Sequence, residues 1–249
     1  AGKGERSGDG YVVTGRWPFS SGCRHSDWLL AGFVETREGA PVIAENGMPV
    51  QRMAFIRAAE VKVIDTWRVS GLRGTGSHDV AVDAVFVPRR FTVDPFFEPP
   101  KQRGPLYGAS MFSFLMMMMA GFPLGVGRRA LDEFRATAHR KTKQPAGTTM
   151  AEEPVVQAAI VRCESDLRAA RALVVESITR VQEAVETEGA ASPPVRARLV
   201  AAVLHAMETA VRVVETAFHA CGASSLYTHQ PLQRCFRDIH AGAQHVAFG

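Results

Sequence analysis

Cysteine and long apolar runs are scarce in this sequence of 249 residues, and their scarcity excludes several classes of protein. The four cysteines form no CxxC pair and no His/Cys cluster with zinc spacing, so we expect free thiols, no metal and a reducing, cytoplasmic compartment. The most apolar stretch, residues 111–126, is interrupted by serine, glycine and proline and is too short to span a bilayer. We therefore expect no membrane partner.

Runs of basic residues are absent as well. Lys and Arg number 29 against 25 Asp and Glu, and the net charge of +4 is not gathered into a stripe. This disfavours nucleic-acid binding, whereas anionic small molecules such as phosphates fit a mild arginine excess. Nothing at the N-terminus has the layout of a signal peptide. Because the chain opens without an initiator Met, we expect its numbering to start inside a longer protein.

Two kinds of periodicity divide the chain. Residues 10–88 are rich in β-branched and aromatic side chains, and residues 80–87 alternate as a half-buried strand does. Turn signals such as Ser7-Gly8-Asp9-Gly10 separate the apolar runs. These features predict a small antiparallel barrel or sandwich over residues 1–100.

Helical periodicity follows Pro99-Pro100. We predict helices over residues 108–140, after Pro154, after Pro193-Pro194 and over residues 231–248. The apolar stripes on the two longest comprise Val155, Ala159, Cys163, Leu167 and Val174, then Leu199, Val203, Met207, Ala210, Val214 and Ala217. The fold class is therefore α+β, with an antiparallel four-helix bundle over residues 101–249.

Three segments have the composition of a ligand site. Residues 15–23 run from a strand into a small polar turn beside aromatic rings, and the alternative is a hairpin end with core aromatics. Residues 71–79 are glycine-rich but open no helix, which excludes a dinucleotide fingerprint and a P-loop; a flexible loop is the alternative. Residues 222–238 offer hydroxyls and amides to an anion at a helix N-terminus, or are simply helix caps.

The order of these segments resembles the middle and C-terminal domains of the acyl-CoA dehydrogenase superfamily. The resemblance rests on GYVVTGRWPFSSGC at residues 10–23, on residues 65–88 with GLRGTGSHDV, and on residues 223–245 with ASSLY, RDIHA and QH. It is closer to the two-component flavin-dependent monooxygenases that hydroxylate phenols and the steroid A-ring. The helical N-terminal domain that normally precedes the β domain in that family is missing from this sequence, and the family's substrate pocket depends partly on that domain.

A missing carboxylate separates the two branches of the superfamily. Acyl-CoA dehydrogenases need a glutamate base, and the position that the resemblance gives it is Val246, directly after His245. The other known location lies on the first long helix, yet residues 101–131 contain no Asp or Glu. Because valine cannot abstract a proton, dehydrogenation is disfavoured. An acyl-CoA dehydrogenase-like flavoenzyme and a non-catalytic fragment or subunit remain the alternatives.

The resemblance implies how the chain would hold a flavin, with reduced FMN favoured over FAD. Ser21 falls where the family places a hydroxyl near flavin N5, and His245 would orient a phenol or donate a proton to the flavin C4a-hydroperoxide. For Trp17 a core position is the alternative, for Arg140 a helix-dipole contact, and for His245 a surface position. The implied cofactor-binding residues are Trp17, Phe19, Ser20, Ser21, Arg140, Ser224 and Ser225.

The resemblance also implies partners. No nucleotide-binding fingerprint for NAD(P)H is present, which is consistent with a separate NAD(P)H-flavin reductase on another chain. O2 and a small aromatic compound would be the co-substrates. A flavin site built from two subunits implies a homo-oligomer, with a tetramer usual in the family.

Overall fold

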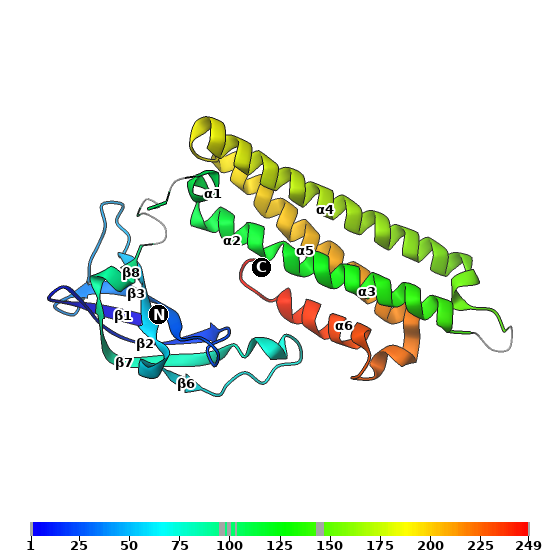
Figure 1. Cartoon of the computed structure of the whole chain (residues 1–249), viewed down its shortest axis with the longest axis horizontal. Helices are drawn as coiled ribbons and strands as arrows, with labels where there is room; N and C mark the ends of the chain where they lie inside the picture. The colour runs from blue at the N-terminus through cyan, green and yellow to red at the C-terminus, as the bar shows by residue number, and fades with distance from the viewer. Residues whose placement is uncertain (1, 95–97, 99–100, 103, 143–146, 249) are drawn as a thin grey trace. The chain divides into compact units, whose positions relative to one another are not determined.

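The computed structural model describes residues 2–94, 98, 101–102, 104–142 and 147–248. The chain forms two compact units (Figure 1): the first comprises Ala1–Val69 and Arg73–Pro99, and the second Ser70–Leu72 and Pro100–Gly249. The predicted boundary between residues 100 and 101 adjoins residues 99 and 100, which lie outside the described residues, so it stays a prediction. The three-residue segment Ser70–Leu72 belongs to the helical unit, which the sequence pattern did not indicate.

The described residues of the first unit form one eight-stranded sheet in the order β6-β7-β2-β1-β3-β5-β8, with β4 paired to β3. Every pair in it is antiparallel except β1 with β3, so the sheet is mixed rather than antiparallel throughout. The strands are β1 (Gly2–Ser7), β2 (Gly10–Ser20), β3 (Trp28–Arg37), β4 (Ala40–Pro41), β5 (Gln51–Arg57), β6 (Lys62–Ile64), β7 (His78–Pro88) and β8 (Thr92–Val93).

Side chains of β2, β3 and β5 meet in the core of this sheet. Val13, Phe33 and Ile56 are at most 2% exposed, and the Tyr11 ring lies 5.2 Å from that of Phe33. Gly4 on β1 is a glycine because a Cβ there would overlap the Phe33 ring. The inward positions of three strands thus meet in one apolar layer.

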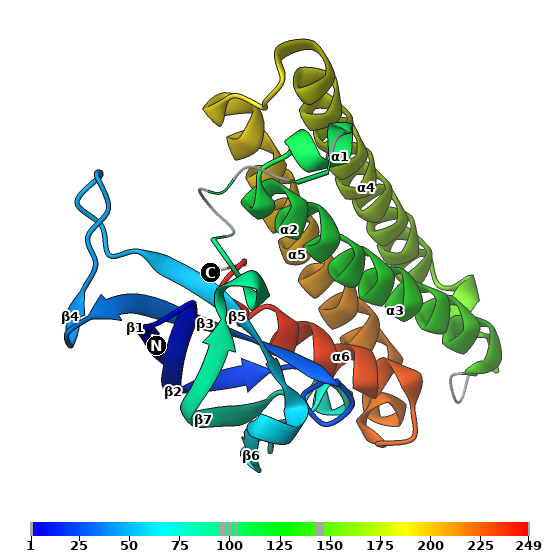
Figure 2. The ribbon, with the colours of Figure 1, turned by 60° about the vertical axis from the view of Figure 1, so that its left-hand side comes forward.

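The second unit is a helical bundle. Its helices are α1 (Pro105–Gly108), α2 (Met111–Met119), α3 (Gly121–Arg140), α4 (Pro154–Glu188), α5 (Pro193–Cys221) and α6 (Pro231–Gly242). Helices α4 and α5 lie side by side and run antiparallel, joined by a short turn that begins at Gly189 in the left-handed conformation (Figure 2). With this unit the predicted fold class, a β unit followed by four main helices, is confirmed.

Two helix predictions need correction. The helix expected over residues 108–140 is interrupted at Ala120, where α2 ends and α3 begins. The last helix ends at Gly242 rather than at Phe248, so His245 lies in the turns that follow it.

The apolar stripe of α5 is confirmed in full, since all six predicted residues are at most 3% exposed. On α4 the stripe begins one residue later than predicted. Val156 is 7% exposed and Val155 is 68% exposed. One residue is about 100° of helix rotation, and only Val156 is in phase with Cys163 and Leu167 further along the helix.

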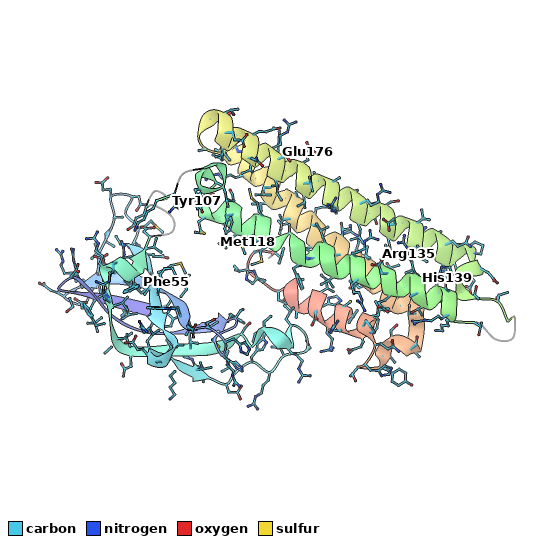
Figure 3. The ribbon with its side chains drawn as sticks, in the orientation of Figure 1. Phe55, Tyr107, Met118, Arg135, His139 and Glu176 are labelled. Carbon is cyan, nitrogen blue, oxygen red and sulfur yellow. The ribbon has the colours of Figure 1, made fainter. Side chains whose placement is uncertain are left out.

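Helices α2 and α3 together, Met111–Arg140, are long and apolar enough to cross a membrane, judged by length and composition, and 28% of the most apolar window is buried. The expectation from residues 111–126 alone did not include this continuation. A helix that packs in the core of a soluble protein can have the same length and composition. We call Met111, Phe112, Leu115 and Met118, all at least 42% exposed, the α2 apolar face (Met118 is labelled in Figure 3).

An ion-pair cluster joins α3 to α4. Glu164 accepts two hydrogen bonds from Arg128, of 2.7 and 3.0 Å, and one of 2.8 Å from Arg135. The hydrogen bonds from Arg128, and to a smaller extent Arg135, lower the pKa of the Glu164 carboxyl from its usual value of 4.5. Because the pKa of Glu164 is lower in the folded than in the unfolded protein, its ion pairs stabilise the fold at any pH above the unfolded-state pKa. This stabilisation is lost as the pH falls through the folded-state pKa.

We expect Glu164→Gln to lower the free energy of unfolding at pH 7 by about 1 kcal/mol. The difference from the wild type should shrink as the pH falls from 4.5 through the lowered pKa of folded Glu164, where the wild-type carboxylate takes up a proton and the ion pair is lost. Urea unfolding followed by circular dichroism at several pH values measures it. Glu176→Gln, an exposed position on the same helix without an ion pair among the described residues, is the matched control (Figure 3). Equal destabilisation by both variants would contradict the prediction.

Candidate functional site

The end of β2 and the loop before β7 form one local structure. Ser20 pairs with His78, and the register between the two strands shifts between Trp17 and Ser20. The amide of Gly22 donates to the carbonyl of Thr75 at 2.8 Å. Two of the three segments singled out from the sequence, residues 15–23 and 71–79, therefore contact each other in the first unit.

Three hydroxyl groups are linked within this structure. The Oγ atoms of Ser21 and Ser77 are 2.8 Å apart, and the Oγ of Ser77 is 2.7 Å from the Oγ1 of Thr75. Ser77 is 5% exposed, whereas Ser21 is exposed at the surface. We call Ser21, Ser77 and Thr75 the hydroxyl chain. Its outer residue, Ser21, has an exposed hydroxyl that a ligand could reach, while Ser77 in the middle is buried and Thr75 is partly buried.

Phe19 lies beside the hydroxyl chain in an unusual conformation. Its φ of 60° lies in the left-handed region, which costs a bulky residue roughly 1–2 kcal/mol, and its ring is 73% exposed. The ring meets Trp67 edge-on with a centroid distance of 6.2 Å. Strain of this kind persists where a surrounding structure imposes it, and it is concentrated at ligand sites. An exposed ring next to fixed hydroxyls suits a flat heteroaromatic ligand.

His78 holds Trp67 in place. Its Nδ1 accepts hydrogen bonds from the backbone amides of Thr66 and Trp67, at 3.2 and 3.1 Å, and the side chain is buried. The adjacent Asp79 accepts from Thr66 Oγ1 at 3.0 Å. These contacts make His78 a positioning residue for this loop rather than a group that reaches a ligand.

Trp17 and Ser20 have different surroundings from Phe19. The indole N–H of Trp17 donates to the carbonyl of Gly32 at 2.6 Å, and its ring packs against the sheet core. A Cβ on Gly15 would overlap that ring. Trp17 is therefore a packing residue here, which is the alternative that the sequence left open. Ser20 is partly buried in the last position of β2.

In the second unit, Arg140 and Ser224 belong to the same end of the bundle. Lys141, which follows α3, donates from Nζ to the Cys221 carbonyl at 2.7 Å, and Ser224 Oγ donates to the same oxygen at 2.9 Å. Arg140 is exposed and forms no ion pair within the described part of the chain. A cation at a helix C-terminus interacts favourably with the helix dipole, and the exposed guanidinium of Arg140 is also available to an anion.

Ser225 is the one site residue whose hydroxyl is buried without a partner among the described residues. It is 2% exposed and lies in the short 3-10 turn Gly222–Leu226 that precedes α6. An unpaired buried hydroxyl costs about 1–3 kcal/mol. A polar group of a ligand that bound this loop could supply the hydrogen bond that the Ser225 hydroxyl lacks.

His245 does not join Arg140 and Ser224. Those two lie by the start of α6, whereas His245 follows its end, about 18 Å further along a twelve-residue helix. The exposed imidazole accepts at Nδ1 from the amide of Ala247 at 3.1 Å, which assigns the proton of the neutral ring to Nε2. Val246, the position of the absent base, is 86% exposed.

Arg237 and Asp238, the first two residues of the RDIHA motif, form hydrogen bonds to another segment of the chain. The carboxylate of Asp238 accepts from the amide of Leu72 at 2.7 Å, and the guanidinium of Arg237 donates to the carbonyl of Ser70. Both residues thus bind the segment Ser70–Leu72 to α6 within the second unit. No sequence signal links positions more than 160 residues apart in this way.

The described residues contain no group of three or more His, Cys, Asp or Glu side chains that could hold a metal ion. The chemistry that the described residues offer is hydrogen bonding by hydroxyls, an exposed aromatic face and arginine charge.

Comparison with known proteins decides the family. Residues 117–249, more than half of the chain, match the family described as acyl-CoA dehydrogenase, C-terminal domain. The chain belongs to the acyl-CoA dehydrogenase family. The predicted resemblance is thereby confirmed at the level of the superfamily, and the relatives specify its branch.

Two curated proteins similar to this acyl-CoA dehydrogenase-family chain are named as monooxygenases. The chain is 29% identical to indole-3-acetate monooxygenase from Pseudomonas putida, over 96% of this chain and 60% of that protein. It is 30% identical to the flavin-dependent monooxygenase oxygenase subunit HsaA from Mycobacterium tuberculosis, over 96% of this chain and 61% of that protein. Among solved structures, XiaF from Streptomyces sp. in complex with FADH2 and glycerol has a TM-score of 0.87 and 25% sequence identity. The match covers 100% of this chain and 63% of XiaF. The chain thus spans about three fifths of these relatives.

Proposed function

We propose that this acyl-CoA dehydrogenase-family chain is part of the oxygenase component of a two-component flavin-dependent monooxygenase that hydroxylates a small aromatic compound. The observation that carries the proposal is the site at Phe19 and the hydroxyl chain, where a strained backbone exposes an aromatic ring beside a fixed hydroxyl. The relatives support it, because both curated proteins are named as monooxygenases and XiaF binds FADH2. The missing carboxylate at Val246 supports it against dehydrogenation.

Within the proposal the residues divide into two roles. Phe19 and Ser21, with Ser20 beside them, would contact the flavin ring and exclude water from one side of it. Arg140, Ser224 and Ser225 would hold its phosphate end, and the orphaned hydroxyl of Ser225 supports this. His245, with the proton on Nε2, would donate to the substrate oxygen or orient a phenol. Bound reduced flavin would supply the electrons that activate O2.

The proposal includes partners. A separate NAD(P)H-flavin reductase would supply reduced flavin, for which we favour FMN over FAD. HsaA is named as an oxygenase subunit, which supports a reductase on a different chain. A homo-oligomer, a tetramer by analogy with the family, would cover the α2 apolar face, where Met118 is 62% exposed. Four cysteines, all free and buried, support a cytoplasmic setting.

An anaerobic mixing experiment tests the function. The protein is saturated with reduced FMN, or with reduced FAD, and mixed with oxygenated buffer while the absorbance of oxidised flavin is followed. We expect its return to be delayed far beyond that of free flavin, and phenols or indoles added before mixing to gain one oxygen atom by mass spectrometry. Return at the rate of free flavin would contradict the proposal. Anaerobic bleaching of oxidised flavin by acyl-CoA thioesters would indicate the dehydrogenase alternative.

A further inference from the structure

The hydroxyl chain contains two residues to which the proposed function assigns no role. Ser77 is 5% exposed, and its Oγ is 2.8 Å from that of Ser21 and 2.7 Å from Oγ1 of Thr75. Each of the three hydroxyls carries one proton to donate and lone pairs that accept. Either Ser21 or Ser77 can therefore donate the hydrogen bond between them, which gives that bond two polarities. The polarity decides whether Ser21 offers a ligand a lone pair or a proton.

In one polarity Ser21 donates to Ser77, and Ser77 donates to Thr75. The outer lone pairs of Ser21 then face the ligand, so Ser21 acts as an acceptor. In the other polarity Thr75 donates to Ser77 and Ser77 to Ser21, and the proton of Ser21 is free to be donated to the ligand. The two states interconvert by hydroxyl rotation alone, so no proton changes its oxygen.

We infer that Ser77 is a positioning residue that sets Ser21 as an acceptor for reduced flavin. The inference rests on the proposed function, in which Ser21 lies at flavin N5. Reduced flavin carries a hydrogen on N5 and donates it, so the hydroxyl of Ser21 needs an acceptor for its own proton, and Ser77 supplies it at 2.8 Å. Oxidised flavin accepts at N5, and Ser21 then donates its proton to the ligand and needs no acceptor in the protein.

The Ser77 hydroxyl should consequently favour the binding of reduced over oxidised flavin. Removing it in Ser77→Ala leaves the proton of Ser21 without an acceptor only when reduced flavin is bound. We expect the dissociation constant of reduced FMN to rise about tenfold more than that of oxidised FMN. For a two-electron couple this lowers the potential of the bound flavin by about 30 mV.

The test combines both dissociation constants, from fluorescence titration, with the potential of protein-bound FMN, from equilibration with a reference dye. A double-mutant cycle of Ser77→Ala with Ser21→Ala separates positioning from structure. If Ser77 acts through Ser21, Ser77→Ala shifts the potential in the wild type but causes no further shift in Ser21→Ala. The same shift in both backgrounds, or none in either, overturns the inference.

Two more variants keep the test decisive. Thr75→Val removes the group that accepts from Ser77 and should shift the potential in the same direction; this variant decides the matter if Ser77→Ala does not fold. Ser26→Ala is the matched control, because its hydroxyl bonds to the Gly22 carbonyl in the same turn but not to the hydroxyl chain. If the wild type binds neither form of FMN and neither form of FAD, the proposed function itself fails, which the titration shows before any variant is compared.

Discussion

Gly71→Ala is expected to lower the free energy of unfolding of the helical unit by about 2–3 kcal/mol, as overpacking of a tight contact does. A Cβ on Gly71 would overlap the carbonyl of Arg237 in the backbone of α6. Backbone cannot swing aside as the end of a side chain can, so the segment Ser70–Leu72 must move away. The amide of Leu72 would then lose its 2.7 Å hydrogen bond to Asp238. Chemical unfolding followed by helix circular dichroism measures the loss.

A second glycine in the same loop provides the control. Gly74 is exposed, and a Cβ there would meet nothing within 4 Å. Gly74→Ala should leave stability unchanged or raise it slightly, because alanine restricts the unfolded chain. Hydrogen exchange at the amide of Leu72 should quicken in Gly71→Ala alone. Equal stability and equal exchange in the two variants would show that the close contact of Gly71 does not constrain the loop.

Phe19→Gly is expected to weaken flavin binding by roughly 10- to 100-fold without loss of thermal stability. The wild-type ring is 73% exposed and contributes little to the core, whereas burying a phenylalanine against a ligand contributes about 1.5–3 kcal/mol. Glycine adopts a φ of 60° without strain, which offsets its greater freedom in the unfolded chain. Fluorescence titration and the melting temperature report the two effects separately.

Two further variants separate the ring from the strain. Phe19→Ala removes the ring but keeps a Cβ in the left-handed region. It should therefore bind flavin as weakly as Phe19→Gly and melt at a lower temperature than Phe19→Gly. Glu38→Gly relieves a comparable φ of 54° in the turn between β3 and β4 and should not alter flavin binding. Unchanged affinity in both Phe19 variants would remove Phe19 from the proposed site.

Periodic features of the fold were predictable because they depend on local spacing. The α5 stripe from Leu199 to Ala217 is buried as its helical spacing predicts. The predicted alternation of residues 80–87 holds only at its start, where Val80 and Val82 are buried. The phase changes at Ala84, whose φ is 51°, so that Phe86 is 51% exposed and Val87 only 3%. Errors occurred where spacing gave no answer. The phase at the start of α4 was wrong by one residue, Val155 for Val156, and α6 ended six residues early.

The site was predictable in part, and for the same reason. The turn with Phe19 and Ser21 is marked in the sequence by aromatic and small polar residues close together. The contribution of Ser77 and the role of Asp238 could not be predicted, since each depends on a contact between segments distant along the chain. The glycines at 71 and 74 look alike in the sequence, and only the backbone of α6 distinguishes them.

The sequence by itself determined the β unit, the helical bundle and the family, because hydrophobic periodicity and the order of motifs can be recognised without knowing which residues are in contact. Tertiary structure decided which hydroxyls meet, which aromatic ring is exposed and which glycine is indispensable. Hydrogen bonds and close packing act over about 3–4 Å, and chain folding brings such atoms together from residues up to 167 positions apart.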